Sequence, residues 1–140
     1  MQFSIEAGAW IGTAFLVCPE SLTPEAAHPR ILRAKETDTV YTRAIDVAMG
    51  YPWPSKFGER VLRSDFIERW TGEEEDLAHN DEARQGLSRA KKDDDFTLAE
   101  IDAGQGVRVL KSARPASEIV RDFSAGAVGL LSRWAETTQN

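Results

Sequence analysis

A glycine followed by a hydroxyl residue, Gly12-Thr13, is the pair in this sequence best suited to bind a phosphate group. A glycine lets an anion approach the main chain, and a threonine hydroxyl with successive amides can hydrogen-bond phosphate oxygens. The pair lies inside an apolar run, residues 9–17, so the glycine could instead relieve crowding in a buried strand. Both interpretations place Gly12 and Thr13 on a strand.

A second glycine motif, Gly104-Gln105-Gly106, interrupts a segment of alternating apolar residues. This segment, residues 97–110, predicts a strand that leads into a glycine turn. The motif lacks the third glycine and the following helix of a dinucleotide-binding fingerprint. We therefore interpret it as a turn or a bulge.

The histidine, cysteine and acidic residues form no catalytic or metal-binding pattern. His28 and His79 have no Cys, Ser or carboxylate at a spacing that specifies a catalytic pair. Because Cys18 is the single cysteine, the sequence cannot assemble a usual structural zinc site. The acidic runs at residues 73–76 and 93–95 lack the ligand spacing of a calcium loop. We predict no catalytic residue and no metal site, and interpret both histidines as surface residues.

Aromatic residues gather in and after an irregular loop at residues 49–58. Tyr51, Trp53 and Phe57 lie between glycines and prolines, and Trp70 follows the loop. Such rings could line a ligand pocket or fill a core, and we favour the core.

Short elements must position these residues. Residues 9–17 are apolar on both alternating faces, which predicts a strand covered on both sides, as in parallel sheets and barrels. No other segment repeats this pattern. Short helices are predicted at residues 23–28, with Thr23 as N-cap, and at residues 30–36. Alternation at residues 40–47 predicts a strand.

Helices are predicted for most of the remaining chain. Ser64 is the expected N-cap of a helix that Gly72 ends. The charged residues 73–95 predict surface helices that lie on a small apolar stripe. A last helix has apolar residues at helical spacing: Ile119, Val120, Phe123, Ala127, Leu130, Leu131 and Trp134. Its two glycines, Gly126 and Gly129, suggest close packing against another element.

The composition limits the class of protein. A chain of 140 residues, 41% hydrophobic and 29% charged, is typical of one folded domain. Lys and Arg number 17 against 23 Asp and Glu, and the net charge of -6 disfavours a general nucleic-acid surface. The apolar run at residues 7–18 is too short for a membrane helix, and no Lys or Arg precedes it as in a signal peptide. A single cysteine fits the reducing cytoplasm best.

Four short motifs, taken in order, resemble the nitronate monooxygenase family, also called 2-nitropropane dioxygenase-like. They are GAWIGTAFL at residues 8–16, TVYTRA at 39–44, FGERVLR at 57–63 and AGQGV at 103–107. A terminal helix follows them, so the resemblance runs from Gly8 to Trp134.

The resemblance implies an enzyme in which an FMN-dependent (β/α)8 barrel oxidises alkyl nitronates with molecular oxygen. A smaller α/β region near the C-terminus covers the flavin. This chain looks like the C-terminal portion, so we expect an α/β fold, or α+β as an isolated fragment. Residues 1–22 would be the last strand of the TIM barrel with an altered N-terminus. Residues 23–113 would form a mostly helical covering region with short strands, and residues 114–140 an amphipathic helix.

The resemblance also implies a cofactor site. Trp10, Ile11, Gly12 and Thr13 match the end of the last barrel strand, which holds the FMN phosphate in that family. A complete barrel takes about 250 residues, and neither histidine of this chain matches the catalytic histidine of the family. Asp102 and Arg108 depart from the family pattern around the flavin-covering loop.

We expect a C-terminal fragment or truncated paralogue of an FMN-dependent nitronate monooxygenase, inactive by itself. If completed, it would bind FMN and a small nitronate substrate. The alternative is a non-catalytic α+β module that binds a partner chain or self-associates, because an unpaired hydrophobic strand needs some cover.

Overall fold

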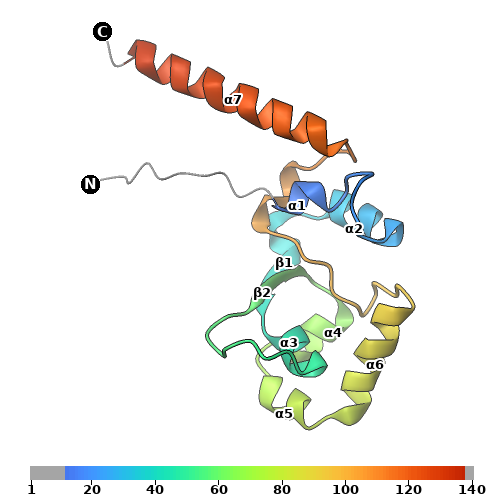
Figure 1. The fold of residues 1–140 in the computed structure, drawn as a ribbon. Coiled ribbons are helices and arrows are strands. Elements are labelled where there is room, and N and C mark those ends of the chain that lie inside the picture. Colours follow the sequence, from blue (N-terminus) through green and yellow to red (C-terminus); the bar gives the residue numbers. More distant parts are fainter. Residues whose placement is uncertain (1–11, 138–140) are drawn as a thin grey trace.

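The structure is a computed structural model that describes residues 12–137, and it is a mixed α/β fold (Figure 1). Within that range β1 (Thr39–Thr42) and β2 (Glu59–Leu62) form a two-stranded antiparallel sheet. The register pairs Thr39 with Leu62 and Thr42 with Glu59. The helices are α1 (Gly12–Phe15), α2 (His28–Arg33), α3 (Ala44–Met49), α4 (Asp65–Trp70), α5 (Glu74–Ala78), α6 (Asp81–Lys92) and α7 (Ala116–Thr137). Three 3-10 turns, η1 (Glu25–Ala27), η2 (Glu36–Asp38) and η3 (Gln105–Val109), complete the described elements.

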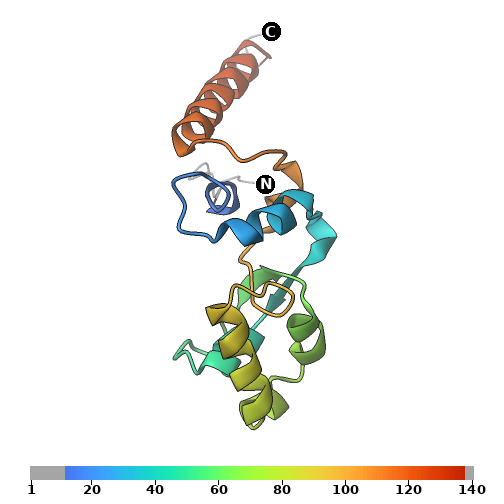
Figure 2. The same ribbon diagram turned by 90° about the vertical axis from the view of Figure 1, so that its right-hand side faces the viewer.

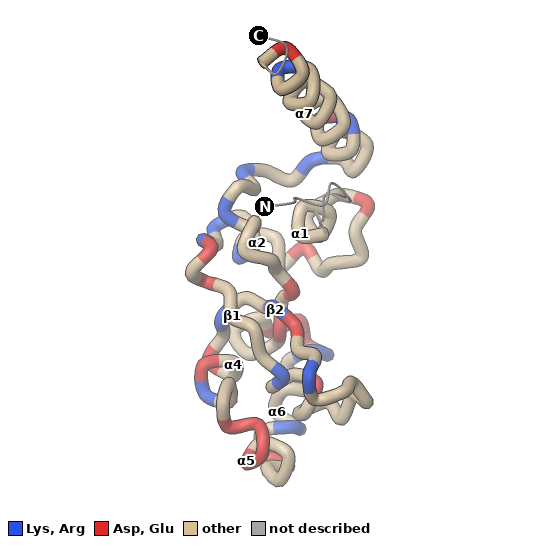
Figure 3. The backbone as a smooth tube through the Cα atoms, turned by 90° about the vertical axis from the view of Figure 1, so that its left-hand side faces the viewer, with Lys and Arg blue, Asp and Glu red and all other residues tan. Residues whose placement is uncertain are grey.

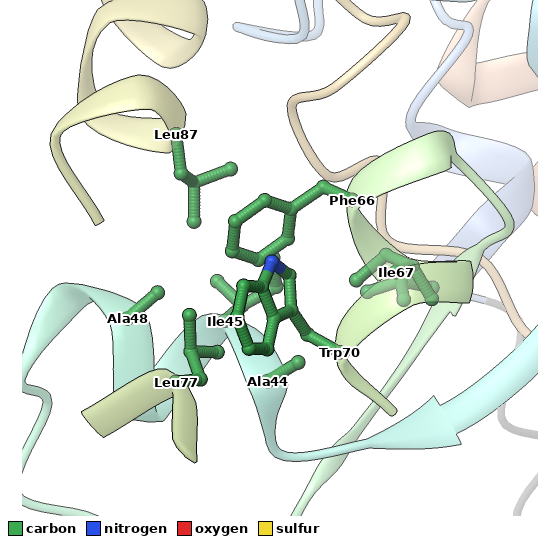
Figure 4. Packing of buried hydrophobic residues seen from close by; sticks show 9 residues of the cluster. Ala44, Ile45, Ala48, Phe66, Ile67, Trp70, Leu77 and Leu87 are labelled. Carbon is green, nitrogen blue, oxygen red and sulfur yellow. The ribbon is translucent and has the colours of Figure 1, made fainter. Parts of the chain in front are cut away.

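The sheet separates two apolar clusters. Successive residues of a strand point to opposite faces, so Val61 joins one cluster and Leu62 joins the other. Figure 4 shows side chains of the first cluster, which come from α3, α4, α5 and α6. Its members are Ala44, Ile45, Ala48, Val61, Phe66, Ile67, Trp70, Leu77 and Leu87. The second cluster contains Val17, Ala27, Ile31, Leu62, Ile101, Ala103 and Val107.

The sequence correctly predicted α4 and its ends. The Ser64 hydroxyl accepts a hydrogen bond from the Ile67 amide at 3.3 Å, as an N-cap does. Gly72 follows the helix with φ of +89°, a conformation that favours glycine. The helices predicted in residues 73–95 are α5 and α6, and their apolar stripe includes the buried Leu77 and Leu87.

The strand predicted at residues 9–17 is wrong for its described part. Residues 9–11 lie outside the described residues, and Gly12–Phe15 is the helix α1. The Leu16 amide donates to the Thr13 carbonyl at 3.2 Å, and the Cys18 amide donates to the Phe15 carbonyl at 3.3 Å. These backbone groups are thus satisfied locally, because among the described residues no strand lies alongside to pair with them.

Two other predicted strands are shorter than expected. β1 ends at Thr42, whose hydroxyl accepts a hydrogen bond from the Ala44 amide at 3.0 Å, and α3 begins there. Of residues 97–110, only Asp102 forms an isolated bridge, opposite Val61. The following glycines begin η3 instead of continuing a strand. The helix predicted at residues 23–28 is the turn η1, and Pro24 rather than Thr23 holds its N-cap position.

The aromatic residues of the 49–58 loop do not join the core. Trp70 is buried, as expected, but Tyr51, Trp53 and Phe57 are 45–62% exposed. The prolines of this loop cannot donate to a ladder, so the loop stays irregular. Lys56 lies 5.0 Å from the Phe57 ring centroid, a position typical of a cation–π contact at the surface.

The C-terminal helix has the predicted extent but a different environment. α7 follows Pro115 and extends away from the sheet and its helices (Figures 1 and 2). None of its described residues is buried. The close packing expected at Gly126 is absent, since a Cβ built there meets no described atom within 4 Å. In residues 12–137 no helix is long and apolar enough to cross a membrane.

Candidate functional site

The two glycine motifs of the sequence meet at one wall of a cavity in the described part of the chain. The Gly104 amide donates a hydrogen bond to the Thr13 hydroxyl at 2.9 Å, although 91 residues separate them. The cavity has a volume of about 1020 Å³, and Gly12, Thr13 and Gly106 also line it. A Cβ at position 104 would lie 3.4 Å from the Thr13 hydroxyl oxygen, an ordinary van der Waals distance, so the approach does not depend on glycine there.

Basic side chains line another part of this cavity. They are Arg60 of β2 and, between η3 and α7, Lys111 and Arg114. Figure 3 shows the basic positions along the segment that leads into α7. Lys111 donates to the Arg108 carbonyl at 2.8 Å, which leaves two of its three N–H groups for other acceptors. Arg114 is paired with Glu118 at 3.2 Å and with Asp122, so it is partly neutralised.

A carboxyl pair, Glu59 and Asp102, lines the same cavity. Burial, together with the negative charge of Asp102, raises the pKa of Glu59 to about 7. Burial and the charge of Glu100 likewise raise the pKa of Asp102. The Glu59 Oε1 atom is buried with no hydrogen-bond partner among the described residues. At neutral pH this wall therefore carries less negative charge than two ordinary carboxylates would.

Lys91 offsets part of the negative charge that remains near Glu59 and Asp102. It forms an ion pair with Glu100, which is adjacent to the strand bridge at Asp102. Burial opposes the charged ammonium, but the hydrogen bond and charge of Glu100 outweigh this effect and raise the pKa of Lys91. Lys91 is therefore a persistent cation close to the carboxyl pair.

The hydrogen-bond donors of the cavity favour an anion beside Thr13, at the Thr13 wall, and disfavour one beside the carboxyl groups of Glu59 and Asp102. Thr13 uses an oxygen lone pair to accept from Gly104, so its own hydroxyl hydrogen remains available for an acceptor in the cavity. Lys111 adds a positive charge to the same space. A phosphate next to Glu59 and Asp102 would instead meet carboxyl oxygens, whose remaining negative charge repels an anion.

The sequence found part of this site and missed the rest. Gly12 and Thr13 line the cavity, whereas Trp10 and Ile11 lie outside the described residues. The second glycine motif, interpreted as a turn, supplies the partner of Thr13. The sequence reading missed the cavity-lining Lys111 and Arg114, although the basic residues at 108, 111 and 114 repeat every three positions. That repeat was the available signal.

The histidines and the acidic runs contribute nothing to the cavity. Neither His28 nor His79 lines it. His79 is exposed, and its ring Nδ1 lies 2.9 Å from the Glu75 carbonyl. His28, the first residue of α2, is only partly exposed, contrary to the surface interpretation, and its Nε2 atom is buried. Among residues 12–137, no three His, Cys, Asp or Glu side chains are arranged to hold a metal ion.

A comparison with known protein families covers the two glycine motifs that meet at Thr13 and Gly104. The family described as Nitronate monooxygenase matches residues 6–126, most of the chain. This match includes both glycine motifs and the Arg60 strand. The chain belongs to the nitronate monooxygenase family. No curated protein matches the sequence.

Proposed function

We propose that this chain supplies the phosphate-binding wall of an FMN site in a nitronate-oxidising flavoprotein. Gly12 and Thr13 would hold the phosphate, and Trp10 and Ile11, which precede them, would complete the segment. The observation that carries the proposal is the hydrogen bond between Thr13 and Gly104, which joins two family motifs at the wall of one cavity.

The residues present fit the phosphate end of such a cofactor. The volume of about 1020 Å³ is at the upper end of the range for ligand pockets. Thr13 offers a hydroxyl donor, Gly106 leaves open space where a side chain would stand, and Lys111 contributes a cation. The raised pKa of Glu59 reduces repulsion of an anion across the cavity.

FMN, when bound, supplies the redox chemistry, and the protein supplies binding and orientation. The Thr13 hydroxyl would donate a hydrogen bond to a phosphate oxygen, while the Gly104 amide, which donates to the same hydroxyl oxygen, fixes its orientation. Lys111 would balance the phosphate charge.

We also propose that these 140 residues do not oxidise nitronates by themselves. A (β/α)8 barrel has eight strands and takes about 250 residues, whereas two strands are present in residues 12–137. Neither His28 nor His79, the two histidines of this chain, lines the cavity. Completion by further barrel elements is therefore part of the proposal. A cytoplasmic location, expected from the cysteine usage, fits the buried free thiol of Cys18.

The test compares FMN with riboflavin, which lacks the phosphate. Flavin fluorescence and co-elution on size exclusion should show FMN binding that is at least tenfold tighter than riboflavin binding. Thr13→Val should remove most of this preference. The control Thr37→Val changes an exposed threonine outside the cavity and should leave it intact. Equal binding of the two flavins, or no binding of FMN, would contradict the phosphate site.

A further inference from the structure

The segment that leads to Gly104 runs antiparallel beside β2. An isolated bridge joins Asp102 to this strand, and the Ala103 amide donates a hydrogen bond to the Arg60 carbonyl at 3.0 Å. The next amide, that of Gly104, leaves the ladder and donates to the Thr13 hydroxyl. The segment therefore connects β2 to the Thr13 wall of the cavity.

A side-chain contact also joins this segment to β2. Asp102 lies opposite Val61, two positions after Glu59, so Glu59 and Asp102 are diagonal neighbours on one face. The Asp102 carboxylate accepts a hydrogen bond from the Glu59 side chain. An ionised carboxylate has no hydrogen to donate, so Glu59 must hold a proton to form this bond. The Glu59 Oε1 atom is buried with no hydrogen-bond partner among the described residues. Ionisation of Glu59 would thus break the bond and leave a buried charge without a donor.

We propose that the protonated Glu59 side chain is a positioning residue that acts through Asp102 and holds the Gly104 amide on the Thr13 hydroxyl. The inference rests on the proposed function where it concerns the binding of a phosphate at this wall. The position of the Gly104 amide itself can be measured without flavin, so the two proposals can fail separately.

The described groups around Glu59 do little to stabilise its charge. Those that interact with it electrostatically are Asp46 of α3, Lys91 of α6, and Glu100 and Asp102 of the segment after α6. Three of these four are acids, and the cation Lys91 is already ion-paired with Glu100. Burial and the charge of Asp102 therefore raise the pKa of Glu59 to about 7 from the ordinary value of 4.5.

The pH dependence of the wall follows from this difference. When the segment opens, Glu59 becomes solvated and its pKa returns toward 4.5. Between about pH 4.5 and about pH 7 opening therefore releases a proton, and a rising pH favours the open wall. Above about pH 7 Glu59 is ionised in both states, and the effect is constant. Because Ala103 keeps its bond to β2, we expect local opening at Gly104 and not unfolding of the sheet.

The first experiment follows solvent exchange of the Gly104 amide by NMR at pH 5 and pH 8, with each rate divided by the intrinsic rate at that pH. The protection of this amide should fall at least fivefold from pH 5 to pH 8. Urea well below the unfolding midpoint should not change the protection, because the opening is local. Constant protection between the two pH values, or a dependence on urea like that of global unfolding, would overturn the inference.

Variants of Glu59 separate the effect of its proton from the effect of its size. Glu59→Gln keeps a donor for Asp102 and does not titrate, so Gly104 should be as protected at pH 8 as in the wild type at pH 5. Glu59→Leu removes the donor and should lower the protection at both pH values. The matched control Glu82→Gln changes an exposed glutamate of α6 outside the cavity and should keep the wild-type pH dependence. Equal protection in the Gln and Leu variants would refute the positioning role.

The second experiment connects the wall to the proposed phosphate site. From pH 5 to pH 8, the preference for FMN over riboflavin should decrease at least threefold in the wild type relative to Glu59→Gln. The comparison of the two proteins cancels the titration of the FMN phosphate itself. An equal pH dependence in both would overturn the effect of Glu59 on phosphate binding. Failure of both proteins to bind FMN at any pH would contradict the proposed function, while the exchange of the Gly104 amide would still decide the positioning role.

Discussion

The Thr13 hydroxyl accepts a hydrogen bond from the Gly104 amide at 2.9 Å, and this bond links the beginning of the described chain to the segment that leads into η3. It brings the only two glycine motifs singled out by the sequence to one cavity wall. The same bond orients the hydroxyl that the proposed phosphate site requires. Its contribution can be measured without any ligand.

Thr13→Val should lower the free energy of unfolding by about 1 kcal/mol, because the Gly104 amide loses its acceptor in a partly buried place. Thr13→Ser keeps the hydroxyl and should retain most of the stability. Urea denaturation followed by circular dichroism measures both. A Thr13→Ser variant as unstable as Thr13→Val would show that the methyl group, and not the hydrogen bond, is responsible.

Gly58→Ala should destabilise the sheet by about 1–3 kcal/mol. A Cβ at Gly58 would lie 2.5 Å from the Thr42 carbonyl oxygen and 3.1 Å from the Tyr41 ring, and the carbonyl belongs to the backbone of β1. The contrasting variant is Gly86→Ala in α6, where a Cβ meets nothing within 4 Å. That change should stabilise the chain by about 0.5–1 kcal/mol through helix propensity. Thermal unfolding should therefore shift in opposite directions, and shifts of the same sign would contradict the geometry.

Glu59 should make the chain less stable as the pH rises from about 4.5 to about 7. The folded-state pKa of Glu59 is raised to about 7 from the ordinary value of 4.5, chiefly by burial. The unfolded chain therefore releases this proton first, and the folded state loses stability until both states are ionised. Above about pH 7 this contribution is constant.

Glu59→Gln removes this titration. The free energy of unfolding of the variant, relative to that of the wild type, should therefore increase by about 1–2 kcal/mol between pH 4.5 and pH 7. A pKa shift converts to about 1.36 kcal/mol of free energy per pKa unit. We expect less than this full value because Glu59 is partly exposed and solvent screens its charge. Denaturation at pH 4.5 and pH 8 measures the difference. The control Glu75→Gln alters an exposed glutamate outside the cavity and should not reproduce the gain. An unchanged difference for Glu59→Gln would refute the raised pKa.

Ser64→Ala should cost about 1–2 kcal/mol. The Ser64 hydroxyl accepts from the Ile67 amide at the start of α4 and donates to the Leu98 carbonyl at 3.1 Å. The Ile67 amide and the Leu98 carbonyl would both lose their hydrogen-bond partner, and Ser64 is buried, with 7% of its surface exposed. The matched change Ser124→Ala lies on the exposed helix α7 and should alter stability by less than about 0.5 kcal/mol. Equal costs at the two sites would show that the cap contributes nothing.

Features set by neighbouring residues could be predicted from the sequence. The capping serine, the glycine with positive φ after α4 and the periodicity of α6 and α7 all depend on contacts within one or two helical turns. The family resemblance was also readable from short ordered motifs, and the family match confirms it. Gly12 and Thr13, which the sequence indicates as phosphate-binding residues, line the cavity, and their role there stays a prediction.

The tertiary structure decided what local patterns leave open. An apolar run such as residues 9–17 becomes a strand only where another strand can pair with it, and its described part, Gly12–Phe15, is helical instead. The approach of Gly104 to Thr13 and the exposure of Trp53 depend on how distant segments fold back, which sequence spacing does not specify. By itself the sequence determined α4 with its ends, the presence of α5, α6 and α7, and the family. Only the packing of distant segments decided which residues line the cavity and that the apolar face of α7 remains exposed.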